Sequence, residues 1–62
     1  MPVVIVEMWA GRTKEQKRQL AEGITTAFTQ IGTQAEAVQV IIKDDSKDDW
    51  AIGGKLVSDL GR

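Results

Sequence analysis

The sequence predicts an α+β fold: one β-α-β unit followed by a short C-terminal hairpin, with residues 1–62 in a single domain. Two β-branched apolar segments, residues 3–9 and 37–43, flank an amphipathic segment at 14–31. A Gly-Gly pair between apolar residues near the end of the chain is a hairpin signal. Strands joined through a helix pair in parallel with a right-handed crossover, so we expect a parallel two-stranded core sheet.

The two strands leave one sheet face without a cover. The first strand contains the run Val3-Val4-Ile5-Val6 and ends before Gly11, which supplies a permissive turn. In the second strand, alternation puts three apolar residues on one face: Val38, Val40 and Ile42. We expect the helix to cover that face and to leave Ile5 and Ile41 on the other. An open apolar face is an interaction surface, so we expect oligomerisation to extend the sheet.

The helix predicted at 14–31 has signals at both ends. Thr13 and Gln16 have the spacing of a capping box, and Gly32 stands where a C-terminal glycine is favoured. The apolar stripe consists of Leu20, Ile24, Ala27, Phe28 and Ile31. We expect this stripe to form ordinary core.

Composition narrows the class of function. The net charge is −1, with eight basic and nine acidic residues interspersed, and no basic stripe indicates nucleic-acid binding. Cysteine and histidine are absent, which excludes disulfides and ordinary zinc sites. No segment is apolar and long enough for a membrane span, and no basic region precedes the first apolar run, so we expect no membrane association and a cytoplasmic location. A small domain without disulfides or a structural metal usually needs to associate with other chains, so we expect a homo-oligomer.

The segment after the second strand is polar and then turns apolar. Residues 44–49 contain four aspartates but lack the glycine and distal glutamate of the helix–loop–helix calcium motif. We expect a solvated loop there, with no metal and no other cofactor. The segment from Trp50 to Val57 reads as a hairpin around Gly53-Gly54. A lone hairpin is barely stable in water, so we expect it to reach a neighbouring subunit.

Pro2 is the first candidate for proton chemistry. Once Met1 is removed, the Pro2 nitrogen becomes a secondary amine, and no other residue offers a base that titrates near neutrality. The alternative is a structural role, since proline is tolerated at the start of a strand. With Met1 in place, the nitrogen is a tertiary amide and has no basicity.

An ordered set of segments then points to a family. The set is Pro2, Ala10-Gly11-Arg12-Thr13, Glu15-Gln16-Lys17, Val40-Ile41-Ile42 and the segment from Trp50 to Leu56. It resembles the 4-oxalocrotonate tautomerase family, the short members of the tautomerase superfamily, over essentially the whole chain, with one residue missing near Gly32. The resemblance implies a tautomerase fold assembled as a hexamer, a trimer of dimers. It also implies an isomerase that performs enol–keto tautomerisation of an unsaturated 2-hydroxy or 2-oxo acid.

The resemblance implies roles for single residues. Pro2 matches the catalytic proline, a general base whose pKa is lowered by desolvation and a nearby cation. Arg12 matches the arginine that binds a substrate carboxylate. Trp50 falls where an aromatic keeps the site apolar, and Trp9 where leucine is usual. Gln39 departs from the pattern, because well-known members carry an arginine there, whereas glutamine can donate a hydrogen bond to the substrate but cannot offset a full charge.

The departure at Gln39 leaves several readings open. It predicts weak activity on the family's diacid substrate, a different substrate, or a cation supplied by another subunit. Dehalogenase or hydratase chemistry on the same proline would need a water-activating carboxylate, for which Glu7, Asp48 and Asp49 are candidates. A hetero-oligomer with a paralogous chain could complete the site, and a catalytically weak self-assembling homologue is the remaining alternative.

Overall fold

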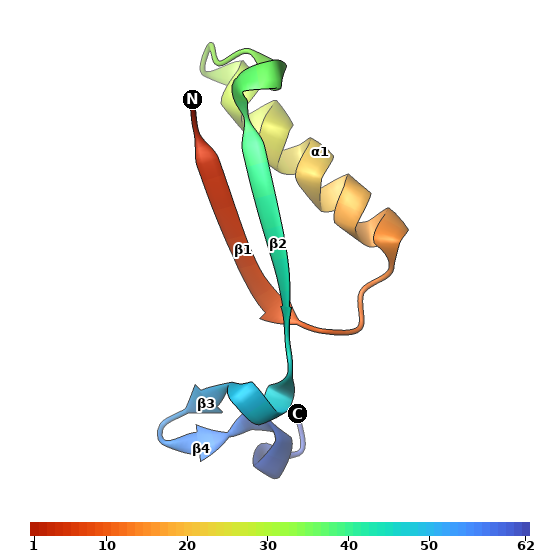
Figure 1. Cartoon of the computed structure of the whole chain (residues 1–62), viewed down its shortest axis with the longest axis vertical. Coiled ribbons are helices and arrows are strands. Elements are labelled where there is room, and N and C mark those ends of the chain that lie inside the picture. Colours follow the sequence, from red (N-terminus) through yellow and green to blue (C-terminus); the bar gives the residue numbers. More distant parts are fainter.

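The computed structural model describes all 62 residues and has the predicted order of elements (Figure 1). The helix and strands are β1 (Val3–Trp9), α1 (Lys14–Gln30), β2 (Gln39–Asp45), β3 (Ala51–Ile52) and β4 (Lys55–Leu56). Short 3-10 turns lie at Ala35–Ala37, Lys47–Asp49 and Val57–Leu60. The α+β prediction of a β-α-β unit with a C-terminal hairpin is therefore confirmed.

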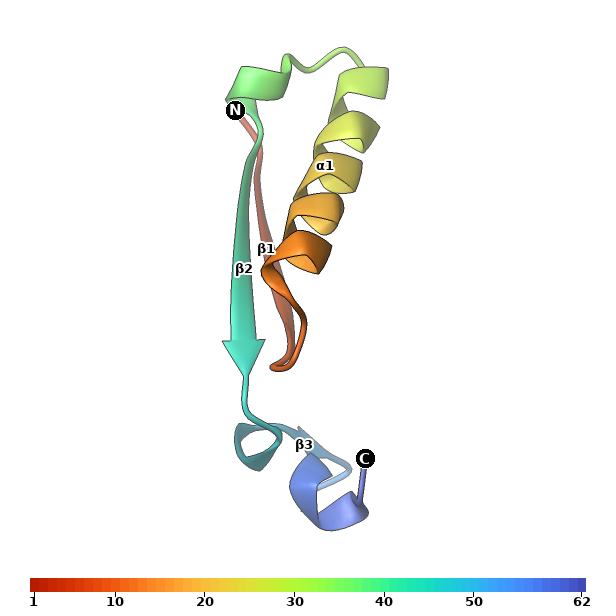
Figure 2. The ribbon, with the colours of Figure 1, turned by 90° about the vertical axis from the view of Figure 1, so that its right-hand side faces the viewer.

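The core sheet is parallel and in register along its whole length. Strand β1 pairs with β2 from Val3 opposite Gln39 to Trp9 opposite Asp45. Helix α1 covers one face, and the other face carries no element (Figure 2). The side chains that alternate toward the helix are half-buried: Val4, Val6, Val40 and Ile42. On the open face, Ile5 is 56% exposed, so the predicted division of the two faces is confirmed.

A capping box fixes the start of α1. The Gln16 backbone N–H donates to the Thr13 hydroxyl at 3.1 Å, and the Thr13 N–H donates to the Gln16 side-chain oxygen at 3.0 Å. These two hydrogen bonds satisfy backbone N–H groups that have no carbonyl partner within the helix. The cap also determines where the chain leaves the loop that carries Arg12.

The end of α1 is a glycine cap. Gly32 adopts φ +96°, and its N–H donates to the Thr29 carbonyl at 3.1 Å. The helix ends at Gln30, one residue before the predicted end, because Ile31 is the C-cap. Ile31 is 77% exposed and Ala27 is exposed as well, so these two members of the predicted apolar stripe do not join the core. No helix in the structure has the length and apolarity needed to cross a membrane.

The predicted bounds of the second strand are wrong by two residues at each end. Residues Ala35–Ala37 close into a 3-10 turn, in which the Val38 N–H donates to the Ala35 carbonyl at 3.1 Å, so the strand begins only at Gln39. The strand continues to Asp45, whose carbonyl accepts from the Ala10 N–H at 3.0 Å. Backbone pairing with β1 therefore outweighs the polar character of the two aspartates.

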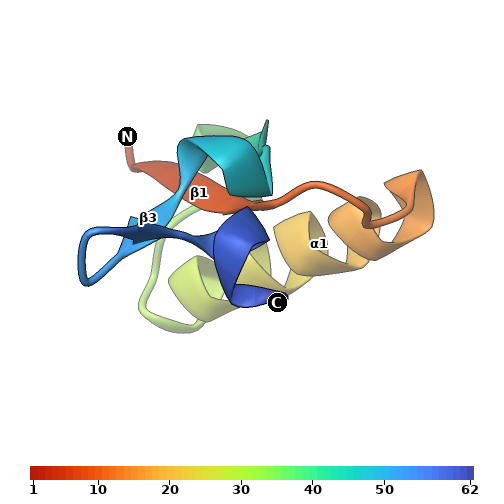
Figure 3. The same ribbon diagram turned by 90° about the horizontal axis from the view of Figure 1, so that it is seen from below.

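The C-terminal hairpin forms around Gly53 and Gly54, which have φ of +59° and +79°. Positive φ at both central residues is the geometry of a tight two-residue hairpin turn, and glycine adopts it without strain. Val57, the only fully buried residue, follows the hairpin and donates its N–H to the Trp50 carbonyl at 2.8 Å. The hairpin lies beyond the C-terminal ends of the core strands and projects to one side (Figures 1 and 3).

The shape of the chain is too extended for a compact monomer. Its radius of gyration is 14.6 Å, against about 10.6 Å for a compact domain of this length. Its accessible surface is 4641 Å², against about 4,000 Å² for a folded monomer of 6.8 kDa. The excess surface and the open sheet face leave apolar area that contact with other chains could bury.

Loss of the helix cap should destabilise the fold. We expect Thr13→Ala to lower the free energy of unfolding by about 1 kcal/mol, because the hydrogen bond from the Gln16 N–H to the Thr13 hydroxyl is lost. Urea denaturation at fixed protein concentration measures this. Thr26→Ala is the control, since Thr26 is exposed within the helix and alanine favours helix. Equal midpoints for the two variants would contradict the role of the cap.

A charge on the open sheet face should break self-association. We expect Ile41→Glu to shift the protein to smaller species in analytical ultracentrifugation, because Ile41 is 44% exposed at the centre of that face. Gln19→Glu, on the exposed surface of α1, is the charge-matched control and should leave the mass unchanged. An Ile41→Glu protein that sediments like the wild type would place the contacts elsewhere.

Candidate active site

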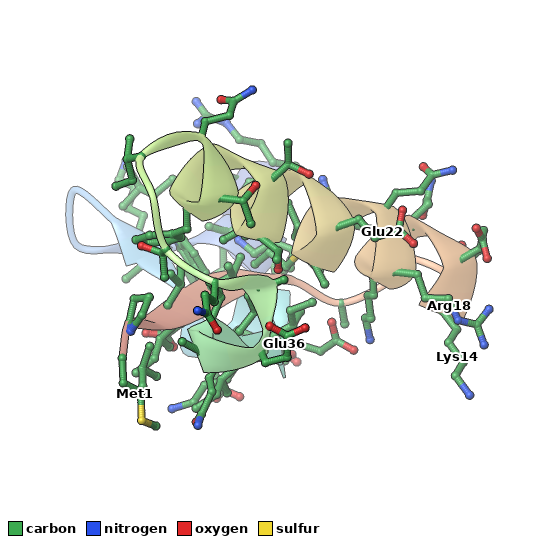
Figure 4. The ribbon with its side chains drawn as sticks, turned by 90° about the horizontal axis from the view of Figure 1, so that it is seen from above. Met1, Lys14, Arg18, Glu22 and Glu36 are labelled. Atoms are coloured by element: carbon green, nitrogen blue, oxygen red, sulfur yellow. The ribbon has the colours of Figure 1, made fainter.

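Pro2 and Gln39 lie side by side where the two core strands begin. The Gln39 backbone N–H donates to the Pro2 carbonyl at 3.0 Å. Pro2 is half-buried, whereas Met1 is 84% exposed. Figure 4 shows the Met1 side chain pointing away from the rest of the chain. Removal of Met1 would therefore uncover a proline nitrogen beside Gln39 without disturbing the packed part of the fold.

Arg12 lies at the opposite end of β1, in the loop that leads to the helix. Gly11 precedes it with φ +127°, a conformation that favours glycine. Arg12 is exposed and forms neither an ion pair nor a hydrogen bond. An ion pair of 2.6 Å between Lys17 and Asp44 ties the start of the helix to β2 beside this loop. The guanidinium of Arg12 is thus left unpaired on a loop anchored at its helical end.

Three side chains gather near the C-terminal ends of the core strands, and we call them the tryptophan corner: Trp9, Lys47 and Trp50. The two indole rings meet edge to face, with centroids 5.7 Å apart and planes at 76°. The Lys47 ammonium lies 5.2 Å from the centroid of the Trp9 ring, within the range of a cation–π contact. The Trp9 Nε1 atom is buried and has no acceptor. The corner joins the end of β1 to the root of the hairpin.

A shallow hollow of about 300 Å³ lies next to the tryptophan corner. Its lining residues are Glu7, Asp45, Asp49, Trp50 and Ala51. Three of these five carry carboxylates, so the hollow is acidic. The carboxylates do not come close enough to form a group that could hold a metal ion. The hollow therefore has one apolar wall, the Trp50 indole, and a rim of negative charges from Glu7, Asp45 and Asp49.

One chain does not bring the four predicted site residues together. Pro2 and Gln39 are at one end of the core sheet, and Arg12 and Trp50 are at the other. A seven-residue strand separates the two ends by about 20 Å. A single small substrate cannot touch all four within one protomer, so a site that uses them all must combine residues of different chains.

Sequence reasoning missed the acidic hollow. Its rim includes Asp45, which pairs with Trp9 at the end of the sheet. The predicted second strand stopped two residues short, and Asp45 was therefore assigned to a solvated loop. A signal was available in the opposite charges of Glu7 and Lys43, which stand directly opposite in the observed register. With the first strand predicted to end at residue 9, that pair sets a register in which Trp9 lies opposite Asp45, two residues beyond the predicted end of the second strand.

The β-α-β unit with its C-terminal hairpin is the fold of the tautomerase class of enzymes, as comparisons with known proteins show. The model of the family described as "Tautomerase enzyme" matches residues 2–60. A probable tautomerase of Bacillus cereus is 47% identical over 60 residues, which is 95% of this chain and 98% of that protein. A 2-hydroxymuconate tautomerase of Bacillus subtilis is 44% identical over 61 residues, which is 97% of this chain and 98% of that protein.

A solved structure gives the same result. It is one of the 4-oxalocrotonate tautomerase isozymes of Methylibium petroleiphilum, with a TM-score of 0.91 and 40% identity. The alignment covers 98% of this chain and 100% of that chain. The chain belongs to the tautomerase family and is an isomerase of the 4-oxalocrotonate tautomerase type.

Proposed function

We propose that this enzyme interconverts the enol and keto forms of an unsaturated 2-hydroxy or 2-oxo acid, with the Pro2 amine as general base. The observation that supports the proposal most is the position of Pro2. It is half-buried directly before β1 and beside Gln39, and the Met1 residue that precedes it is exposed. The name of the 2-hydroxymuconate tautomerase of Bacillus subtilis supports the substrate class.

The reaction needs one proton carrier. After Met1 is removed, the neutral Pro2 nitrogen accepts the proton of the 2-hydroxyl group, and electrons move through the conjugated system. The same nitrogen then returns the proton to a distal carbon, so the proline ends unchanged. Desolvation disfavours the protonated amine and lowers the pKa of Pro2 toward neutrality. A base whose pKa lies near the working pH is the efficient one.

Substrate binding is assigned to Arg12, Gln39 and Trp50. The unpaired guanidinium of Arg12 suits bidentate binding of a carboxylate. Gln39 is the first residue of β2, at the edge where Pro2 lies, and its amide can donate to the 2-oxygen. Trp50 contributes an apolar wall that keeps water from the base. Because Arg12 and Trp50 are a strand length away from Pro2, they reach the same substrate only from other copies.

Assembly is therefore part of the proposed mechanism. The open face, the extended shape and the projecting hairpin all leave surface that other copies can cover. We propose a homo-oligomer, a hexamer built as a trimer of dimers, in which Pro2 of one copy lies beside Arg12 and Trp50 of others. A small-molecule carboxylic acid is the partner of the resulting site.

Replacement of the base should abolish the chemistry. We expect Pro2→Ala to lower kcat for ketonisation of 2-hydroxymuconate at least 100-fold, because a primary amine at a flexible residue is a poorly oriented base. For the wild type, kcat/KM should rise with pH through the pKa of the Pro2 amine, since only the neutral form accepts a proton. Stopped-flow absorbance together with intact mass, to confirm removal of Met1, measures both.

Two outcomes would overturn the proline base. One is a Pro2→Ala enzyme as fast as the wild type. The other is full activity in protein whose mass shows Met1 retained, since an amide nitrogen cannot accept the proton. If neither protein acts on any enol acid, the chain is a self-assembling homologue without this chemistry.

Loss of the arginine should weaken substrate binding. We expect Arg12→Gln to raise KM by roughly 10- to 100-fold, because hydrogen bonds to charged groups contribute about 1.5–3 kcal/mol. Steady-state kinetics measures this, and Arg18→Gln is the control, since Arg18 is exposed on the helix and pairs with Glu15. An unchanged KM in Arg12→Gln would remove Arg12 from the site.

A further inference from the structure

We infer that the tryptophan corner and the acidic hollow beside it select substrates with one carboxylate and a flat apolar end over dicarboxylates. The inference rests on the proposed tautomerase function and deepens it by naming the preferred substrate class. It depends on three features of this chain. Gln39 beside Pro2 is neutral, the rim around Trp50 is anionic, and the Trp9 indole contacts the Trp50 indole edge to face.

The charges around the proposed site favour a substrate with a single carboxylate. A dicarboxylate has an anionic group at each end and needs a cation near both. In this chain Arg12 is the unpaired cation of the proposed site, and Gln39 at the other end is neutral. The wall formed by Trp50 is bordered by Glu7, Asp45 and Asp49, whose negative charges repel a second carboxylate. Lys47 lies over the Trp9 ring and does not line the hollow, so the lining itself contains no cation. A substrate with a single carboxylate avoids that repulsion.

The shape of the hollow favours a substrate with a flat apolar end. Trp50 lines the hollow, and an indole face favours contact with a planar, conjugated or aryl group. Its ring is held edge to face by Trp9, with centroids 5.7 Å apart. Lys47 lies over the Trp9 ring at 5.2 Å, which restrains that ring in turn. Trp9 does not line the hollow, so it acts through Trp50 and is a positioning residue.

The experiment compares two probes in the same assay: an aryl enolpyruvate as the monoacid and 2-hydroxymuconate as the diacid. For the wild type we expect kcat/KM to favour the monoacid at least tenfold. The ratio of the two values is unaffected by the fraction of enzyme that is folded and active. A ratio that favours the diacid would overturn the inference.

Variants of Trp9 test the positioning role. Trp9→Leu removes the edge-to-face contact and should reduce the ratio about tenfold, mainly through the KM for the aryl substrate. Trp9→Phe keeps an aromatic edge against Trp50 and should retain most of the ratio. A ratio that is the same in Trp9→Leu and the wild type would show that Trp9 only fills space.

Variants of the rim test the electrostatic role. Asp49→Asn removes one carboxylate from the hollow and should raise kcat/KM for the diacid about threefold or more, while the monoacid changes little. Asp48→Asn is the matched control, because Asp48 is exposed and does not line the hollow. Equal effects of the two variants on the diacid would show that the rim carboxylates do not disfavour it.

Failure of the inference and failure of the proposed function have different signatures. If neither probe shows turnover that Pro2→Ala abolishes, the tautomerase proposal itself fails. If both probes show turnover that depends on Pro2, but the ratio favours the diacid or does not respond to Trp9→Leu and Asp49→Asn, only the selectivity is wrong.

Discussion

The parallel register between β1 and β2 is the constraint on which the rest of the structure depends. It sets Pro2 beside Gln39 at one end of the sheet and Trp9 beside Asp45 at the other. A slip of one residue would turn every side chain to the opposite face. Both the face that α1 covers and the face left open would then lose their character. The register is thus what gives each end of the sheet its chemistry.

The placement of the proposed site residues at opposite ends of the sheet follows from the small size of the chain. A protein of 62 residues with one helix cannot wrap its own sheet and also enclose a substrate. It places a proline at one end of a strand and a cation with an aromatic wall at the other, about 20 Å apart. Repetition of the chain in an assembly is the economical way to bring opposite ends together, and the proposed mechanism relies on it.

Local signals predicted most of the fold, and long-range pairing explains what they missed. The capping box at Thr13, the glycine cap at Gly32 and the Gly53-Gly54 turn depend on neighbours in sequence, and each is present in the structure. The bounds of β2 depend on its partner strand, and that is where the prediction failed. The resemblance supplied Pro2, Arg12, Gln39 and Trp50 as candidates, but neither it nor the spacing placed them at opposite ends. The contact between the two indoles also needed the tertiary structure.

The hydrogen bond at the start of the sheet has a consequence for the life history of the chain. It uses the Pro2 carbonyl and the Gln39 N–H, and no atom of Met1. Excision of Met1 would therefore break no strand pairing. The proposed change of the Pro2 nitrogen from an amide to an amine would alter the chemistry of the molecule without altering its strand pairing.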